Sequence, residues 1–405
     1  MQKSGDAVIL MNKSEIRYLV GNDKLEVKPF PIYSDMAILL LDTLSRELRN
    51  DKEAREYPDI LTFAFWCRRA NITKLKEEYR TQFLRIGRGL IFHIAPSNVP
   101  INFAFSLAFG ILAGNANVVR VSEKDFPQTK IVCRILKNLL ENPEFTLIRK
   151  QTQIVSYGHI KDINDYYSYL CDVRIIWGGD TTIETIRRSP IGMKATEITF
   201  ADRFSFAVFD EATMERLTPQ ELEKVGEKFY NDTYLMDQNA CSSPHLILWK
   251  ASERKVGRKN FWNMTAQTAQ KYDLSEKKVL DKYTILCEKA TEINEMVSVS
   301  RYTNLLYVVG LKDIPEWMDE VRGKFGLFYE ADLSNMEMLC SKISTKMQTC
   351  VTYGIDNQKF AEMLIENHAL GIDRIVPVGQ AMNIGVHWDG YDVIGNMSRE
   401  IVTIS

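Results

Sequence analysis

The spacing of apolar residues divides the chain near Gly89. Charged segments with apolar positions at helical spacing precede it, and they predict helices over residues 36–50 and 59–72. This pattern places Trp66 and Cys67 in a core rather than at a reactive site. Short β-rich runs that alternate with helical segments follow Gly89, so the pattern becomes that of an α/β protein.

The segment after Gly89 repeats a strand, a helix and a strand. These elements are predicted, in order, at residues 89–95, 101–114, 117–121, 127–142, 153–158, 163–170 and 173–179. Consecutive strands joined by such helices pair in parallel. Up to Arg188 the chain is therefore predicted to form one doubly wound, nucleotide-type domain.

A mixed α/β pattern follows. Thr218, Pro219 and Glu221 match a capping box with proline at the first helical position, which predicts the start of a helix. That helix leads to a polar turn that carries Cys241 and then to an apolar strand. Two charged helices around 253–296 and further strands complete the pattern, without an internal repeat or a long linker.

The charge balance gives no sign of a polyanionic partner. Lys and Arg number 51 and Asp and Glu number 53, so the formal net charge is −2. Such a charge does not steer a protein toward nucleic acid or an anionic membrane. The longest stretch without these charged residues, 89–119, contains prolines, asparagines and glycines that fit a buried α/β core better than a membrane span. We expect neither nucleic acid nor a membrane as a partner.

The seven cysteines are scattered and contain no C-x-x-C pair. This usage is typical of a reducing cytosol, where a thiol can serve as a nucleophile. The first twenty residues hold only a four-residue apolar run, which is too short for the core of a signal peptide. We therefore expect a cytoplasmic protein. No group of His, Cys, Asp and Glu has metal-ligand spacing, so no metal is predicted.

Cys241 has the most suggestive setting among the cysteines. Cys133 and Cys287 lie inside helical patterns and Cys171 ends one, whereas Cys241 lies in a polar turn where N–H donors can activate a thiol. A structural cysteine is the alternative at this position. His245 suggests a Cys/His pair, but a proline intervenes and the strand pattern favours a histidine in the strand core.

Two further turns follow predicted strands. Asn98 lies in a proline-flanked turn after the first strand, where its amide either donates to an oxyanion or closes the turn through its own backbone. The motif WGGDTT at 177–182 ends a strand with glycines and a polar helix start. This arrangement suits a pyrophosphate, or a plain helix N-cap at Asp180 or Thr181.

Four blocks carry a family resemblance. They are HIAPSNVPINFAFSLAFGILAGNANVVRVS (93–122), DQNACSSPH (237–245), LGIDRIVPVGQA (370–381) and WDGYDVIGNMSREI (388–401). With the WGGDT turn, and in this order, they resemble the aldehyde dehydrogenase superfamily. They are more closely similar to its acyl-CoA reductase branch, the LuxC-type fatty acid reductases of luminescence operons. The resemblance extends over roughly residues 85–405.

The resemblance implies an aldehyde dehydrogenase-like α/β fold. Its expected parts are N-terminal helices with a Rossmann-type NADP-binding domain over 1–206, and an α/β catalytic domain with Cys241 over 207–375. A C-terminal segment over 376–405 is expected to return to the cofactor domain or to a subunit interface.

Roles for the acyl-transfer residues follow from the resemblance. It implies that Cys241 is the nucleophile and that Asn98, together with the backbone N–H of Cys241, forms the oxyanion hole. Glu197 in ATEITFAD is the nearest candidate for the superfamily's general base, although the glycines that normally follow that glutamate are absent.

Cofactor contacts follow in the same way. Arg120, Ser122 and Glu123 fall where the superfamily grips the adenosine ribose, and Gly179 and Asp180 fall where it meets the pyrophosphate. Arg120 replaces the usual lysine and suits a 2′-phosphate, which favours NADPH. Asp180 replaces a serine and opposes a phosphate at that point.

The implied reaction is the NADPH-dependent reduction of a fatty acyl thioester to a fatty aldehyde through an acyl-cysteine. Reduction needs no activated water, so the uncertain general base fits this direction. A CoA-acylating dehydrogenase for short aldehydes is one alternative. A non-catalytic scaffold for an acyl-transfer partner is another, although a scaffold has no need for both Cys241 and Asn98. The implied partners are an acyl thioester, an acyl-protein synthetase and further copies of the chain in a homo-oligomer.

Overall fold

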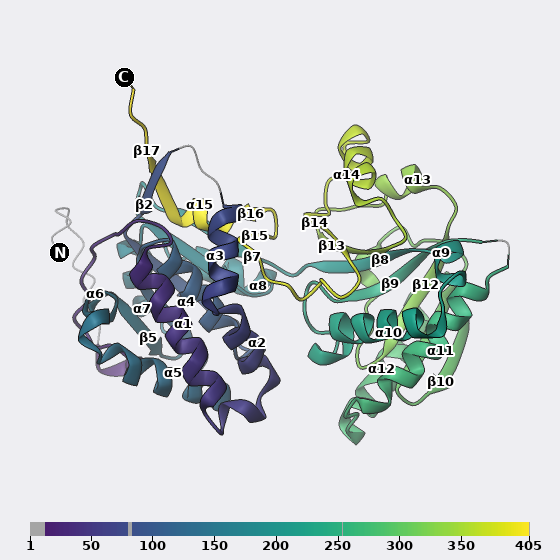
Figure 1. Cartoon of the computed structure of the whole chain (residues 1–405), viewed down its shortest axis with the longest axis horizontal. Coiled ribbons are helices and arrows are strands. Elements are labelled where there is room, and N and C mark those ends of the chain that lie inside the picture. The colour runs from purple at the N-terminus through teal and green to yellow at the C-terminus, as the bar shows by residue number, and fades with distance from the viewer. Residues whose placement is uncertain (1–12, 80–82, 253, 405) are drawn as a thin grey trace. The chain divides into compact units, whose positions relative to one another are not determined.

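The computed structural model describes residues 13–79, 83–252 and 254–404. The described residues form two compact units (Figure 1). The first unit comprises the described residues up to Ala201 together with those from Gly385 onward, and the second comprises the described residues within Asp202–Ile384. The domain boundaries expected after residues 206 and 375 stay a prediction. The apolar run near the amino terminus lies outside the described residues.

The first unit is built on a sheet with the order β1-β5-β4-β3-β6-β7. Its strands are β1 (Arg17–Val20), β3 (Leu90–Ile94), β4 (Ala116–Val121), β5 (Thr152–Ser156), β6 (Val173–Trp177) and β7 (Thr196–Phe200). β3 to β7 pair in parallel, whereas β1 pairs with β5 antiparallel. The strand order reverses between β3 and β6, as it does at the ligand-binding edge of a Rossmann-type sheet.

Helices pack around this sheet. They are α1 (Asp35–Asn50), α2 (Pro58–Trp66), α3 (Arg69–Glu78), α4 (Asn102–Leu112), α5 (Pro127–Leu140), α6 (Thr146–Lys150), α7 (Lys161–Leu170) and α8 (Asp180–Arg187). The helix predicted over 59–72 is two helices, because the extended backbone of Arg68 (ψ 140°) separates α2 from α3. Trp66 and Cys67 are buried, as the pattern predicts.

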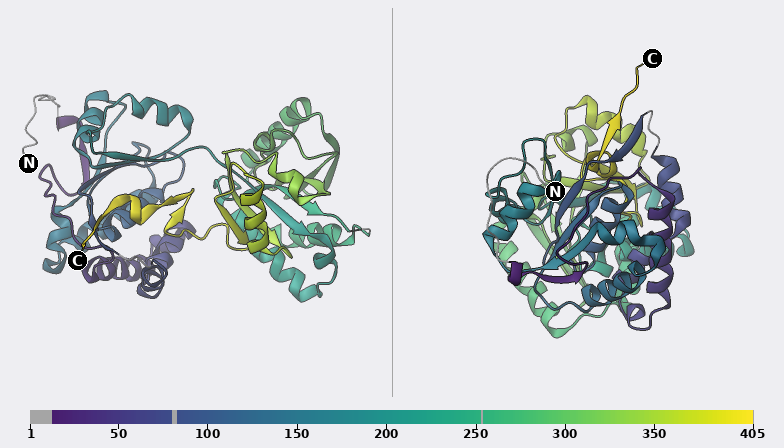
Figure 2. Two further views of the ribbon diagram at one scale, coloured as in Figure 1. Left: turned by 90° about the horizontal axis from the view of Figure 1, so that it is seen from above. Right: turned by 90° about the vertical axis from the view of Figure 1, so that its left-hand side faces the viewer.

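The end of the chain belongs to the first unit. β17 (Ser398–Ile401) pairs antiparallel with β2 (Leu84–Gly87), so that segments more than three hundred residues apart lie side by side (Figure 2). Before β17 come β15 (His387–Trp388), β16 (Tyr391–Asp392) and α15 (Val393–Met397). The side-chain amide of Asn115 donates to the carbonyl oxygen of Met397 at 2.9 Å, which ties α15 to the start of β4.

The second unit has a sheet in the order β10-β11-β12-β9-β8-β13-β14. Its strands are β8 (Phe204–Asp210), β9 (Pro244–Lys250), β10 (Met296–Thr303), β11 (Leu306–Leu311), β12 (Leu327–Leu333), β13 (Met347–Tyr353) and β14 (Arg374–Pro377). β10 pairs antiparallel with β11, and the other neighbours pair in parallel. The predicted α/β class is therefore confirmed in both units.

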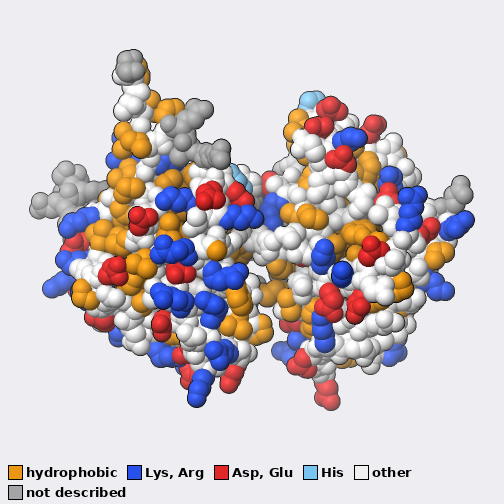
Figure 3. Space-filling model, in the orientation of Figure 1, with side chains coloured by type: hydrophobic (Ala, Val, Ile, Leu, Met, Phe, Trp, Pro, Cys, Tyr) orange, Lys and Arg blue, Asp and Glu red, His pale blue; other side chains and the backbone are white. Residues whose placement is uncertain are grey.

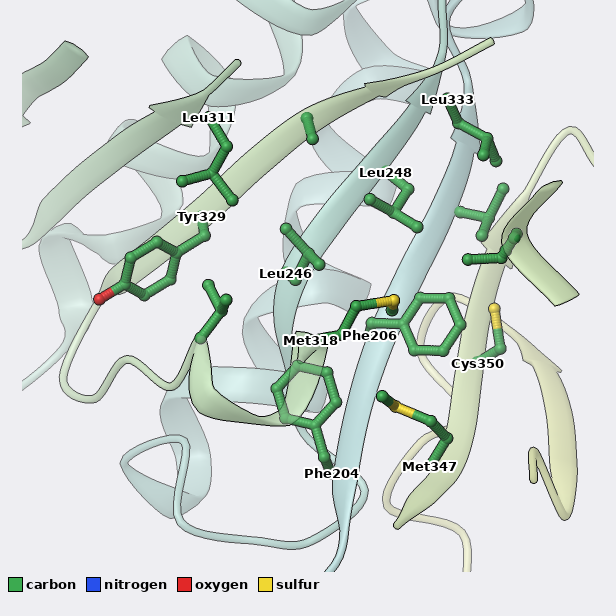
Figure 4. Packing of buried hydrophobic residues seen from close by; sticks show 14 of the residues in the cluster. Phe204, Phe206, Leu246, Leu248, Leu311, Met318, Tyr329, Leu333, Met347 and Cys350 are labelled. Carbon is green, nitrogen blue, oxygen red and sulfur yellow. The ribbon is translucent and has the colours of Figure 1, made fainter. Parts of the chain in front are cut away.

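Both faces of this second sheet are buried. On β8, Phe204 and Phe206 face one hydrophobic cluster while Phe209 belongs to the opposite one. Figure 4 shows the first cluster, where Leu246 and Leu248 from β9 lie beside the phenylalanines. A parallel sheet needs this continuous apolar character, because helices cover its two faces.

Helices of the second unit are α9 (Glu211–Glu215), α10 (Pro219–Thr233), α11 (Val256–Thr268), α12 (Glu276–Glu292), α13 (Met336–Cys340) and α14 (Asn357–Glu366). The predicted capping box is present: Thr218 Oγ accepts from the backbone of Glu221, whose carboxylate accepts from the backbone of Thr218. In the described part of the chain, no helix is long and apolar enough to cross a membrane. Charges of both signs are interspersed over the visible face of each unit (Figure 3).

Candidate active site

Asn98, predicted for the oxyanion hole, and four residues predicted to bind the cofactor lie at one edge of the first sheet. Asn98 follows β3, Ser122 and Glu123 follow β4, and Gly179 and Asp180 follow β6. Because these strands are parallel, their carboxyl ends share an edge. Apart from half-buried Ser122, all of these residues are exposed. The structure thus groups these five predicted residues where α/β sheets bind ligands.

Lys124, which the sequence reasoning did not single out, joins two of these loops. Its Nζ donates to the carbonyl oxygen of Ser97 at 3.3 Å, and its backbone N–H donates to Ser122 Oγ at 3.1 Å. The turn that contains Asn98 is therefore held beside the loop that contains Glu123. The exposed ammonium also places a positive charge at this edge of the sheet.

Arg120 lies near the end of β4, with its guanidinium over the ring of Tyr157 at 4.9 Å. Nη2 donates to the carbonyl oxygens of Tyr157 and Gly158 at 3.4 and 3.3 Å. Nε is buried and has no hydrogen-bond partner among the described residues. A Cβ atom on Gly158 would come within 3.3 Å of Glu123 Oε2, so the carboxylate of Glu123 lies against the end of β5.

The WGGDTT motif forms the predicted strand, glycine turn and helix start. Gly179 is the N-cap of α8 and Asp180 is its first residue, so the predicted N-cap at Asp180 or Thr181 is off by one or two positions. A Cβ atom on Gly179 would meet nothing within 4 Å. The start of α8 is thus open to solvent or a ligand.

A buried chain of hydrogen bonds lies beneath this edge, and sequence reasoning missed it. Asn117 donates from Nδ2 to the carbonyl oxygen of Asn115, so its Oδ1 accepts from Nε2 of His93 at 3.0 Å. Nδ1 of His93 then accepts from Ser106 Oγ at 2.7 Å, and Ser106 Oγ accepts from Nε1 of Trp177 at 3.0 Å. Burial lowers the pKa of His93 to about 4, so the imidazole is neutral near pH 7.

Glu197 lies near the amino-terminal end of β7, at the opposite end of the strand from the loops described above. Its Oε2 accepts from Nε of buried Arg174 at 2.8 Å, and its Oε1 accepts from Nε of Arg187 at 2.7 Å. Both carboxylate oxygens are therefore held by arginines. This geometry gives Glu197 a structural partner on each side and does not favour it as a proton acceptor.

In the second unit, Cys241 lies in the predicted turn between α10 and β9. Asp237 and Gln238 precede it with positive φ angles of 55° and 57°. Buried Gln238 accepts from the backbone of Gly326 at 2.7 Å and donates to the carbonyl oxygen of Leu327 at 3.2 Å. These bonds to the start of β12 hold the backbone in a left-handed conformation that residues other than glycine rarely adopt.

Cys241 is half-buried, and residues of β8 and β13 contact it. Ser205 Oγ donates to the carbonyl oxygen of Cys241 at 2.6 Å, and Gln348 Nε2 lies 3.3 Å from its Sγ. Sequence reasoning missed both contacts, since Gln348 is 107 residues away and has no motif around it. His245 is buried in β9, and its Nδ1 donates to the carbonyl oxygen of Gly323 at 2.8 Å, which confirms the strand-core interpretation.

The other cysteines have different surroundings. Cys67, Cys133, Cys171, Cys340 and Cys350 are buried, whereas Cys287 is exposed on α12. Burial raises the pKa of Cys133 to about 12 and that of Cys67 well above its usual range. Cys287 was predicted to lie in a helix, and it does, but on the solvent face. Within the described residues, no three His, Cys, Asp or Glu side chains come together in a way that could hold a metal ion.

Known proteins match this chain in sequence, in structure and through a family model. A long-chain acyl-protein thioester reductase of Vibrio harveyi is 25% identical over 171 residues, which are 41% of this chain and 33% of that protein. Long-chain acyl-protein thioester reductase 2 of Photobacterium leiognathi is 24% identical over 189 residues, which are 46% of this chain and 36% of that protein. The chain thus spans about a third of the length of these relatives.

Among solved structures, a NAD-dependent benzaldehyde dehydrogenase from Corynebacterium glutamicum superimposes with a TM-score of 0.58 at 12% identity. The match covers 90% of this chain and 82% of that one, so the fold is the aldehyde dehydrogenase fold. The model of the family described as acyl-CoA reductase (LuxC) matches residues 67–297, which is more than half of the 405 residues. The chain therefore belongs to the acyl-CoA reductase (LuxC) family.

Proposed function

We propose that the protein reduces a fatty acyl thioester to a fatty aldehyde through an acyl group carried on Cys241. The observation that carries the proposal is the setting of this thiol. Of the cysteines in the described residues, Cys241 alone is half-buried in a rigid turn with an amide N–H at its sulfur. Access together with a hydrogen-bond donor is what an activated cysteine needs.

The first half of the reaction transfers the acyl group. The Sγ thiolate of Cys241 attacks the acyl carbon, and the side-chain amide of Asn98 donates to the oxyanion that forms. When the carbonyl is restored, the bond to the first carrier breaks and its thiolate leaves with the electron pair. Exposure of Asn98 in the turn after β3 supports this role, because its amide is accessible to an acyl group.

The second half is reductive. When bound, NADPH would supply the hydride that converts the acyl carbon to the aldehyde level. The carboxyl edge of the first sheet fits a dinucleotide, since the start of α8 is open at Gly179 and Glu123 is exposed for a ribose hydroxyl. In this proposal, Arg120 and Ser122 also bind the adenosine ribose and its 2′-phosphate. Asp180 lies on the pyrophosphate side, and its exposed carboxylate can turn toward solvent.

The acyl donor and the assembly state are further parts of the proposal. The relatives are named for acyl-protein thioesters, so we propose a donor acylated by a synthetase partner. Exposed Leu84, Ile401 and Val402 on and beside the β2–β17 ribbon support a homo-oligomer, because an apolar strand edge tends to be covered. Sedimentation of the full chain tests this: a monomer at every concentration excludes the homo-oligomer.

The activity is tested with a series of acyl-CoA chain lengths and NADPH, with the aldehyde identified by mass spectrometry. The proposal predicts aldehyde from long chains with the wild-type protein and none with Cys241→Ala. A rate that is highest for the shortest chains would instead support a CoA-acylating dehydrogenase of short aldehydes. Absence of aldehyde from the folded protein, with every acyl-CoA and also with a long-chain acyl-protein thioester, would contradict the proposal.

A further inference from the structure

Gln348 is a buried amide that faces the sulfur of Cys241. It is the second residue of β13 and only 1% exposed, and its Nε2 lies 3.3 Å from Sγ. A primary amide is costly to bury unless its polar atoms are bonded. A thiol sulfur is a weak acceptor, whereas a thiolate is a charged one that gains more from an N–H donor. The contact thus favours the ionised form of the cysteine.

The surrounding hydrogen bonds orient this amide. Arg374 Nη1 donates to Thr349 Oγ1 at 3.5 Å, which leaves the hydroxyl hydrogen of Thr349 for Oε1 of Gln348 at 3.3 Å. Because Oε1 is the acceptor from Thr349, Nε2 is the atom that faces the sulfur. The direction of each bond therefore agrees with donation to Cys241.

Arg374 is itself fixed by the chain that follows β14. Its guanidinium donates to the carbonyl oxygens of Ala381 at 3.3 Å and Asn383 at 3.0 Å. β13 has a second connection to the Cys241 turn, which runs through β8. The backbone of Thr349 donates to Ser205 Oγ at 3.1 Å, and Ser205 donates to the carbonyl oxygen of Cys241. Thr349 and Gln348 thus hold both the backbone and the sulfur of Cys241.

We propose that Gln348 is a catalytic residue of the reductase, donating its Nε2–H to the Cys241 thiolate in both halves of the reaction. The inference rests on the proposed function. In the first half, the donated hydrogen bond keeps Sγ ionised until its electron pair forms the bond to the acyl carbon. In the second half, the alkoxide produced by hydride addition re-forms the carbonyl and breaks the C–S bond. Sγ then leaves with the electron pair as a thiolate, and the N–H of Gln348 donates a hydrogen bond to it again.

The test is the pH dependence of Cys241 alkylation by iodoacetamide in the full chain, read peptide by peptide by mass spectrometry. It needs neither cofactor nor substrate. In Gln348→Met, which keeps the length of the side chain but removes the N–H, the midpoint of Cys241 labelling should rise by about one pH unit or more. Exposed Cys287 in the same molecules is the matched control, and its labelling should not change.

A second variant covers the case in which Gln348→Met does not fold. Gln348→Glu keeps the shape and the acceptor for Thr349, and its carboxylate repels a thiolate, so the labelling midpoint should rise at least as far. An unchanged midpoint in a folded variant overturns the proposal. A raised midpoint together with about tenfold slower acylation supports it. If the midpoint rises but the wild type makes no aldehyde, the proposed function fails while the Gln348–Cys241 interaction stands.

Discussion

The Nε atom of Arg174 lies 2.8 Å from Oε2 of Glu197, and the arginine side chain is buried. This ion pair joins β6 to β7 near the amino-terminal end of the sheet. A second arginine, Arg187, holds the other oxygen of the carboxylate. Glu197, which the family resemblance offers as a general base, is thus bound by two arginines and holds β7 against its neighbours.

Glu197→Gln should therefore affect stability more than catalysis. Loss of one partner of a buried pair leaves the charge of Arg174 poorly compensated, at a cost of ~3 kcal/mol in unfolding free energy. Reduction of acyl-CoA should remain within about tenfold of the wild type, because no water is activated. Urea denaturation and steady-state rates measure the two effects, with exposed Glu184→Gln as the control. A collapse of reduction with acylation intact would show that Glu197 serves the hydride or collapse step.

A second prediction concerns the oxyanion. Asn98→Ala should slow acylation by Cys241 on the order of 10²-fold or more, the scale expected when one oxyanion donor is removed. Binding of NADPH should barely change. The matched control is Ser97→Ala in the same exposed turn, since the contact of Ser97 with Lys124 uses its backbone oxygen. Normal acylation in the Asn98 variant would mean that this side chain only shapes its turn.

Cofactor choice is tested at Arg120. If its guanidinium meets the 2′-phosphate, Arg120→Ala should raise the KM for NADPH much more than the KM for NADH. The comparison of the two cofactors in one variant is its own control, because loss of the contact with Tyr157 alone would affect both equally. An equal change in the two KM values would remove Arg120 from the phosphate site.

Acid should destabilise the first unit through His93. Burial lowers the folded-state pKa of His93 to about 4, below the ordinary 6.5 of the unfolded chain. Between these values the unfolded state binds a proton that the folded state does not. The free energy of unfolding therefore has the full contribution of neutral His93 above about pH 6.5. It falls as the pH drops toward 4, by ~3 kcal/mol in total.

His93→Gln should make the free energy of unfolding less dependent on pH in this range. Urea denaturation at about pH 7 and about pH 4.5 measures the change, because the variant removes the titrating group while keeping a donor and an acceptor for Asn117 and Ser106. His159→Gln, at an exposed position, is the control. An identical pH dependence in wild type and His93→Gln would contradict the assignment of a neutral buried imidazole.

The elements predicted from the sequence are those with a strong local signal. The capping box at Thr218 and the apolar runs at β3, β4 and β9 each contain the physical reason for their structure within a few residues. β1 and the β2–β17 ribbon do not, because their strands are short and partly exposed and depend on partners far away in the sequence. Their pairing is a tertiary effect that periodicity does not encode.

The candidate site divides in the same way. Cys241 and Asn98 lie in turns with recognisable composition, so the sequence indicates them. Gln348, Ser205 and Lys124 act through contacts made only when distant strands or loops come together. The sequence likewise does not indicate that two arginines bind Glu197, since a helix and a neighbouring strand supply them.

The central claim is that Cys241 carries the acyl group, and acyl transfer from labelled acyl-CoA without cofactor measures it most directly. The account predicts that the wild-type chain becomes labelled on Cys241 and that Cys241→Ala accepts no label. Cys133→Ala in the core of α5 and Cys287→Ala on the surface of α12 should both acylate normally. Undiminished labelling of folded Cys241→Ala would contradict the claim and the reaction built on it.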